Sequence, residues 1–276
     1  MVTEIERFVM RIQWLSHSGF LVEGRSASLV FDRFQDPAGV LDAFFARRRA
    51  LAAPPPVLFL VSHAHADHCS PAILDWAREP GVAYVLEKDA ARALLGGPEG
   101  AESAGARARA AREAAAHEVV RVRPGERHAL GAVSVETFGS TDEGVSFLVR
   151  LDGTTVFHAG DLNDWYWEEE STAEELAADE AAFDRVVADV RAATGSDVPL
   201  GAALLPLDPR LGAHAMRGPT RFLVAVPART FVPMHLPAGT GLPGAFAREA
   251  GVSARTLVLD GPGACAELGP DPDPGP

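Results

Sequence analysis

A continuous apolar run that leads directly into a cluster of metal-ligand side chains constrains this chain more than any other feature of its sequence. Residues 57–61 are all apolar, as expected of a strand that is covered on both faces of its sheet. The loop that follows carries His63, His65, Asp67 and His68 within six residues. Imidazole and carboxylate groups are ligands of zinc, iron and manganese in proteins. The segment therefore predicts a metal site on a loop that is held by a rigid strand.

The spacing inside this loop predicts more than one ion. His63 and His65, with one residue between them, can close on a single cation. Asp67 and His68 are adjacent in the chain, so their side chains point in other directions and can serve a second cation nearby. One loop can therefore seed a centre of two metal ions. Asp67 is also the candidate catalytic residue, because its carboxylate could orient a water molecule or return a proton to a leaving group.

Composition bounds the class of protein and its partners. The 276 residues are 47% hydrophobic, and no stretch approaches the roughly 20 apolar residues that a membrane span needs. The first residues lack the basic and apolar regions of a signal peptide, so we expect a cytoplasmic protein. The formal net charge of −13, from 25 Lys and Arg against 38 Asp and Glu, opposes nucleic-acid binding. We expect a small-molecule substrate and no nucleic-acid or membrane partner, while no feature indicates an oligomeric state.

Hydrophobic patterning divides the chain into strands and helices. Strands are predicted at residues 9–15, 20–23, 28–32, 57–61, 82–86, 119–122, 133–138, 146–151, 155–158, 201–207 and 230–234. Helices are predicted at residues 41–52, 71–78, 88–95, 102–118, 172–194 and 220–226. Hairpins first, and then strands alternating with helices, favour two packed sheets with helices outside. We expect one domain over residues 1–260 and a disordered tail over residues 261–276, where Gly, Pro and Asp dominate.

Three more segments place polar side chains beside predicted strands. Asp161 follows a strand in the segment Ala-Gly-Asp-Leu-Asn, and His235 ends another in Pro-Met-His. His17 lies in Trp-Leu-Ser-His-Ser-Gly-Phe-Leu, between the first two predicted strands. Together with the loop over residues 63–68, these segments resemble motifs of the metallo-β-lactamase-fold hydrolase superfamily. The signature of that superfamily is His-x-His-x-Asp-His after a strand. The segment around His17 is similar to that of the ascorbate-phosphate-lactonase-like branch of this superfamily.

The resemblance implies a fold and roles for these residues. The fold is a four-layer αββα sandwich, of the α/β (α+β) class. Asp161 would bridge two cations, and His235 would be the last histidine of the second site. In the lactonase-like branch the histidine at the position of His17 faces the metal pocket, and a structural hydrogen bond within its turn is the alternative role. Trp165 lies just beyond Asp161 and would line a substrate pocket or pack the following helix.

One ligand that the resemblance implies is missing. The family has a further histidine in the loop before the strand predicted at 146–151, but here residues 139–144 read Gly-Ser-Thr-Asp-Glu-Gly. Asp142 could replace the imidazole, Ser140 or Thr141 could offer a hydroxyl, or the ion could keep a water molecule. The first site would then hold His63, His65 and Asp161, and the second site would hold Asp67, His68, Asp161 and His235.

These residues predict a metal-dependent hydrolase. One or two divalent cations per chain, Zn2+ first and Mn2+ or Fe2+ as alternatives, would lower the pKa of a bound water from about 15.7 toward about 7, generating hydroxide at neutral pH. The bond cleaved would be an ester, a lactone or a related bond of a small molecule. That molecule could carry a phosphate group. A phosphodiesterase or nuclease of the same fold is one alternative. A degenerate metal-binding sensor or scaffold without turnover is the other.

Overall fold

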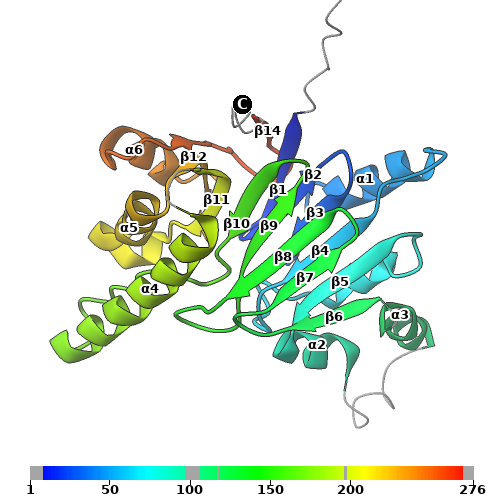
Figure 1. The fold of residues 1–276 in the computed structure, drawn as a ribbon, viewed down its shortest axis with the longest axis horizontal. Coiled ribbons are helices and arrows are strands. Elements are labelled where there is room, and N and C mark those ends of the chain that lie inside the picture. The colour runs from blue at the N-terminus through cyan, green and yellow to red at the C-terminus, as the bar shows by residue number, and fades with distance from the viewer. Residues whose placement is uncertain (1–8, 97–105, 117, 196–197, 270–276) are drawn as a thin grey trace, which may run out of the picture.

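The structure, a computed structural model, describes residues 9–96, 106–116, 118–195 and 198–269. Two seven-stranded sheets pack face to face at its centre (Figure 1). The first sheet has the order β14 (Cys265–Leu268), β1 (Met10–Ser16), β2 (Gly19–Glu23), β3 (Ser28–Phe31), β4 (Val57–Val61), β5 (Val82–Glu87) and β6 (Val119–Val122). The second has the order β13 (Arg255–Thr256), β12 (Ala228–Met234), β11 (Leu200–Pro206), β10 (Thr154–His158), β9 (Ser146–Leu151), β8 (Val133–Phe138) and β7 (Arg127–Leu130).

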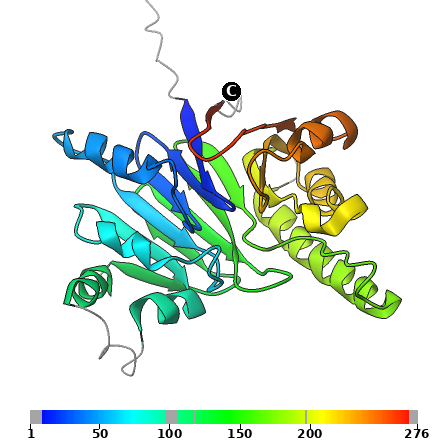
Figure 2. The ribbon, with the colours of Figure 1, turned by 180° about the vertical axis from the view of Figure 1, so that it is seen from behind.

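Helices cover the outer face of each sheet (Figures 1 and 2). The first sheet carries α1 (Val40–Arg49), the 3-10 helix η1 (Pro71–Trp76), α2 (Lys88–Leu95) and α3 (Ala106–Ala116). The second carries α4 (Ala173–Thr194), α5 (Arg217–Ala225) and α6 (Leu242–Glu249), and the 3-10 helix η2 (Pro209–His214) follows β11. The predicted four-layer αββα sandwich is confirmed. Among the described residues, no helix combines the length and the hydropathy that crossing a membrane would require.

The apolar run over residues 57–61 is the buried strand β4. Leu58 and Leu60 face the core between the two sheets, whereas Val57, Phe59 and Val61 face the helices outside. Both faces are covered, which explains why the run has no polar alternation. The ring of Phe59 stacks on that of Trp76 in η1, with 5.9 Å between centroids. This packing fixes the strand, and with it the start of the histidine loop.

Strand direction gathers the predicted ligands at one edge of the sandwich. β4 pairs in parallel with β3 and β5, and β11 pairs in parallel with β10 and β12. Carboxyl ends of parallel strands lie at the same edge of a sheet, where open α/β sheets bind their ligands. The histidine loop follows β4, Asp161 follows β10 and His235 follows β12. The two sheets thus present ligands to a common place.

Two helix predictions need correction or restriction. The helix expected over residues 71–78 is the 3-10 helix η1, which ends at Trp76. Ser70 caps it as expected, accepting the backbone N–H of Ala72, but i→i+3 bonding such as Ala77 N–H to Leu74 O (3.1 Å) replaces the wider α-helical pattern. Of the helix expected over residues 102–118, residues 102–105 and 117 lie outside the described residues.

The prediction of a disordered tail from residue 261 is wrong for its first part. β14 pairs antiparallel with β1, placing Glu267 opposite Arg11 and Cys265 opposite Gln13. The side-chain amide of Gln13 also donates to the carbonyl of Gly263 (2.9 Å). Without β14, strand β1 would be a sheet edge with open backbone groups, and backbone pairing needs no particular composition. The pairing therefore left no hydrophobic signal in the sequence. Residues 270–276 lie outside the described residues.

Candidate metal centre

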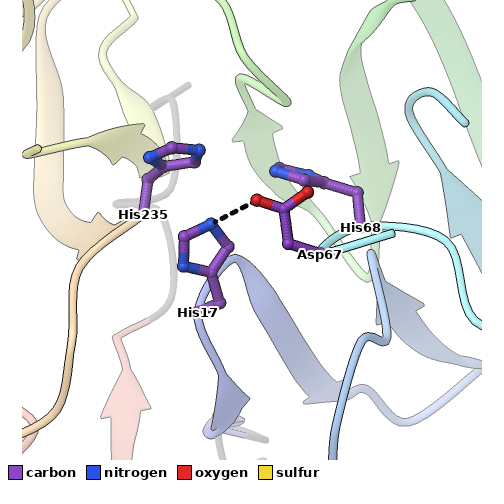
Figure 3. Close-up of side chains that lie close together, drawn as sticks. All are labelled: His17, Asp67, His68 and His235. Carbon is purple, nitrogen blue, oxygen red and sulfur yellow. Dashed lines mark ion pairs between the residues drawn. The ribbon is translucent and has the colours of Figure 1, made fainter. Parts of the chain in front are cut away.

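Two groups of ligand side chains meet at the edge where the strands end. In the first group, one ligand atom each of His63, His65 and Asp161 lies within 4.8 Å of the others. The second group consists of His17, Asp67, His68 and His235 at the same spacing. In Figure 3, His17 and His235 face Asp67 and His68 across a common space. The structure thus brings together all six ligands predicted from the sequence, and it adds His17 to them.

Asp161 lies between the two groups. One of its oxygens, Oδ2, lies 3.3 Å from Nε2 of His63. The other, Oδ1, lies 3.0 Å from Nε2 of His68 and 3.5 Å from Nε2 of His235. The carboxylate therefore presents one oxygen to each group, which is the arrangement that a bridging ligand needs.

The residues present fit a divalent cation. Nε2 of His17, His63 and His68 and Oδ1 of Asp161 are all buried without a hydrogen-bond partner. Buried polar atoms without partners are costly and rare, but cations held by the two groups would satisfy all four. Ligands that lie about 2.0–2.2 Å from one tetrahedral ion are roughly 3.3–3.6 Å apart. The distances of 3.3 Å from His63 to Asp161 and 3.3 Å from His17 to Asp67 match that spacing.

Buried carboxylates orient two of the histidines. Asp32, at the end of β3, accepts the backbone N–H (2.8 Å) and hydroxyl (2.6 Å) of Ser62 and lies 2.8 Å from Nδ1 of His68. Asp208, just after β11, lies 2.9 Å from Nδ1 of His235. Each carboxylate holds the Nδ1 side of its imidazole, so that Nε2 points into the centre. Such partners fix ring orientation and raise the basicity of metal-binding histidines.

The backbone at the centre is held in an uncommon conformation. Four described residues other than glycine have a positive φ, and three of them are His17 (51°), Asp32 (36°) and His235 (61°). A positive φ is disfavoured for residues with a Cβ, and such residues concentrate at functional sites. The surrounding packing therefore holds these three side chains in place against a local conformational cost.

The charges at the centre favour a cation. Burial opposes protonation of His68, but the carboxylates of Asp161 and Asp32 outweigh it and raise the pKa of His68 to about 10. Burial raises the pKa of Asp161, but the imidazoles of His63 and His68 outweigh burial and hold that pKa well below its usual range. The carboxylates thus stabilise positive charge at this place. A metal cation would replace the proton on His68, so that metal binding releases protons.

Of the three residues predicted as substitutes in the loop over residues 139–144, the two with hydroxyl groups form hydrogen bonds with the backbone. The hydroxyl of Thr141 donates to the carbonyl of Asn163 (2.6 Å) and accepts its backbone N–H (3.0 Å). The hydroxyl of Ser140 accepts the backbone N–H of Asp142 (3.3 Å). Asp142 lines the cavity beside the centre, but it contributes no atom to either group of described ligands. Glu143, which was not among the predicted substitutes, lies outside both groups as well, but its Oε2 is 3.5 Å from Nε2 of His65.

A cavity of about 370 Å³ opens onto the centre. It is lined by His65, Asp67, Thr141, Asp142, Asp161, Trp165, Trp167, Asp179, Arg210 and His235. The indole N–H of Trp165 donates to the carbonyl of Asp161 (2.9 Å), and its ring stacks parallel to that of Trp167 at 6.0 Å. The structure thus places Trp165 in the cavity wall, as one of its two predicted roles requires.

Comparisons with known proteins agree with this geometry. A family model described as "Beta-lactamase superfamily domain" matches residues 11–179, more than half of the chain. A metal-dependent hydrolase of Thermococcus kodakarensis is 27% identical, over 94% of this chain and 100% of that protein. The fold is similar to that of Igni18, a metallo hydrolase of Ignicoccus hospitalis (17% identity, TM-score 0.58, 94% of this chain and 98% of that chain).

The fold of this chain is also similar to that of YhfI, a metallo-beta-lactamase fold protein of Bacillus subtilis (13% identity, TM-score 0.58, 94% of this chain and 100% of that chain). These structural similarities concern the fold, whereas the family match carries the classification. The chain therefore belongs to the beta-lactamase superfamily.

Proposed function

We propose that this protein hydrolyses an ester or lactone bond in a small molecule that carries an anionic group. The observation that carries the proposal is Arg210 in the wall of the cavity beside the candidate metal centre. A cavity of about 370 Å³ suits a small molecule, since ligand pockets usually measure roughly 300–1,000 Å³. The proposal includes two divalent cations, with zinc the first candidate because imidazole and carboxylate ligands suit it.

The chain's own residues divide the work at the centre. His63, His65 and Asp161 would hold one cation, and His17, Asp67, His68 and His235, with Asp161 shared, would hold the other. When bound, the metal would supply a water of lowered pKa and a Lewis acid for the bond under attack. Asp161 and the buried carboxylates Asp32 and Asp208 keep the ligands oriented.

Asp67 is positioned both to bind a metal ion and to transfer a proton. Its Oδ2 lies 3.3 Å from Nε2 of His17, and its side chain is partly exposed in the wall of the cavity. The His17 imidazole beside it holds the pKa of the Asp67 carboxyl well below its usual range. The carboxylate is therefore ionised at neutral pH. It could accept a hydrogen bond from the attacking water, take the proton that this water loses and pass that proton to the leaving group.

Arg210 gives the cavity a site for negative charge. It is the one arginine or lysine among the described residues that line the cavity. Its Nε and Nη2 hold Asp208, and its guanidinium carbon lies 5.8 Å from the centre of the Trp167 ring. Its Nη1 makes no hydrogen bond to a described residue and can donate to a carboxylate or phosphate of the substrate. The acidic side chains of Asp142 and Asp179 in the same wall disfavour a polyanion such as nucleic acid.

A panel of substrates tests the proposal on the purified, zinc-loaded protein. We expect hydrolysis of lactones, faster for one carrying a phosphate or carboxylate than for its neutral analogue, and little hydrolysis of a generic phosphodiester. Activity should vanish on chelation and return with zinc, because the water needs the cation. Cleavage of the phosphodiester alone would replace the proposal by a phosphodiesterase. A metal-loaded protein that cleaves nothing in the panel would support the metal-binding sensor or scaffold instead.

Arg210→Gln should lower kcat/KM for the anionic lactone by roughly 10- to 100-fold, because hydrogen bonds to charged groups contribute about 1.5–3 kcal/mol. The measurement is the ratio of kcat/KM between the anionic lactone and its neutral analogue, for the wild type and the variant. Arg210 also holds Asp208, which orients His235, so a loss common to both substrates would report a disturbed metal centre.

Only a change in this ratio reports recognition of the anion. Arg248→Gln is the matched control, because Arg248 lies on α6 and its charged partner is the neighbouring Glu249 at 4.0 Å. That variant should leave the ratio unchanged. A ratio that Arg210→Gln also leaves unchanged would remove the anionic group from the proposal.

A further inference from the structure

We infer that Glu143 is the protein ligand that replaces the missing third histidine at the first metal site. The inference rests on the proposed function only in requiring that the centre binds a cation, and it does not depend on the substrate. It assigns to a residue outside the predicted ligand set a coordination position at the cation held by His63 and His65. The site would then be completed by a carboxylate rather than by water.

The geometry points to Glu143 directly. Its Oε2 lies 3.5 Å from Nε2 of His65, a separation that matches two ligands of one tetrahedral ion. His65 belongs to the group whose ligand atoms, with those of His63 and Asp161, lie within 4.8 Å of one another. Within this group Nε2 of His63 is buried without a hydrogen-bond partner. Glu143 lies outside this 4.8 Å group, but it contacts His65, and its exposed side chain would have to turn toward a cation held there.

The loop that carries Glu143 is anchored on both sides of it. On one side, the hydroxyl of Thr141 is fixed by both hydrogen bonds to the backbone of Asn163. On the other side, the backbone N–H of Val145 donates to the carbonyl of Ser62 (3.0 Å), next to His63. Gly144 packs so closely here that an added Cβ would lie 2.0 Å from the Ser62 carbonyl oxygen. These anchors keep residue 143 beside the histidine loop.

A simple surface ion pair is the competing explanation for the contact. The side chains of His65 and Glu143 are 44% and 56% exposed, and exposed pairs of this kind contribute little. The two explanations differ in what a metal titration would show. A surface pair leaves metal affinity unchanged when the carboxylate is removed, whereas a ligand does not.

The test uses the full-length, metal-free protein titrated with Zn2+ by calorimetry, and with Co2+ by its visible absorption. Glu143→Gln removes the charge without changing the size of the side chain. We expect it to weaken the first site by at least about 10-fold, since losing even an indirect partner of a ligand costs roughly 10- to 100-fold. The Co2+ spectrum of that site should change as well. Asp142→Asn, on the same loop, is the matched control and should leave both unchanged.

Two further variants assign the effect to the first site. Glu143→His should restore tight binding, because it returns an imidazole to the loop. In a His65→Ala background, Glu143→Gln should cost much less affinity than it does alone, since the two residues would hold the same ion. Additive losses, or an unchanged affinity in Glu143→Gln, would overturn the inference while leaving metal dependence intact. A wild-type protein that binds no metal would overturn both the inference and the proposed function.

Discussion

Asp161→Ala should remove most of the metal from the centre, whereas Asp67→Ala should leave one of the two cations in place. Asp161 presents Oδ2 to His63 and Oδ1 to His68 and His235, so its loss affects both groups. Asp67 belongs to the second group alone. Each site should lose at least about 100-fold in affinity in Asp161→Ala, above the cost of disturbing an indirect partner. Hydrolytic activity should be lost with the metal.

The measurement is bound metal per chain after equilibration at a fixed free zinc concentration. Asp179→Ala is a suitable control, because Asp179 lines the same cavity without belonging to either ligand group of described residues. It should retain the metal content of the wild type. If Asp161→Ala and Asp67→Ala lost equal amounts of metal, Asp161 would not bridge the two sites.

Gly144→Ala should destabilise the fold by about 2–4 kcal/mol. The added Cβ would lie 2.0 Å from the carbonyl oxygen of Ser62 and 2.6 Å from Cβ of His63, and neither atom can rotate away. Relieving the clash requires movement of the histidine loop or of the loop over residues 139–144. Overpacking of this kind typically costs about 1–3 kcal/mol. The φ of +75° adds about 1 kcal/mol of conformational strain for a residue with a Cβ. Urea unfolding measures the loss of stability. An assay of bound metal shows whether the histidine loop has moved.

Gly125→Ala separates strain from close packing. Gly125 has a similar φ of +84°, but an added Cβ there would meet no atom within 4 Å. We therefore expect that variant to lose only about 1 kcal/mol and to keep its metal. Equal destabilisation of the two variants would mean that the loop at Gly144 does not press against the metal loop.

The sequence predicted those parts of the site that depend only on one strand and the few residues that follow it. The buried run at β4 and the ligands at the ends of β4, β10 and β12 are each visible within a few residues. Their convergence followed from the family resemblance and from the parallel pairing of these strands. The two-residue turn at Asp152 and Gly153, between the strands predicted at residues 146–151 and 155–158, is also a local feature, and both residues have the positive φ that such turns require.

Other parts depend on contacts between segments far apart in the chain. Asp32 and Asp208 are single carboxylates after apolar strands, and only the fold shows that each lies against an imidazole 36 or 27 residues away. Asp142 and Glu143 are adjacent acidic residues, and spacing alone cannot show which of them faces a site. The pairing of β14 with β1 bridges more than 250 residues without a hydrophobic pattern.

The division of the ligands between the two sheets has a consequence for the order in which the protein matures. The ribosome delivers His17 and the whole histidine loop first, and Asp161 emerges 93 residues after His68 (161 − 68). At about 5–20 residues per second, that interval lasts roughly 5 to 20 s. During this time the nascent chain carries an incomplete set of imidazole and carboxylate ligands, without the bridging carboxylate. His235 follows 74 residues after Asp161 (235 − 161), so the ligand set is complete only after strand β12 has been synthesised.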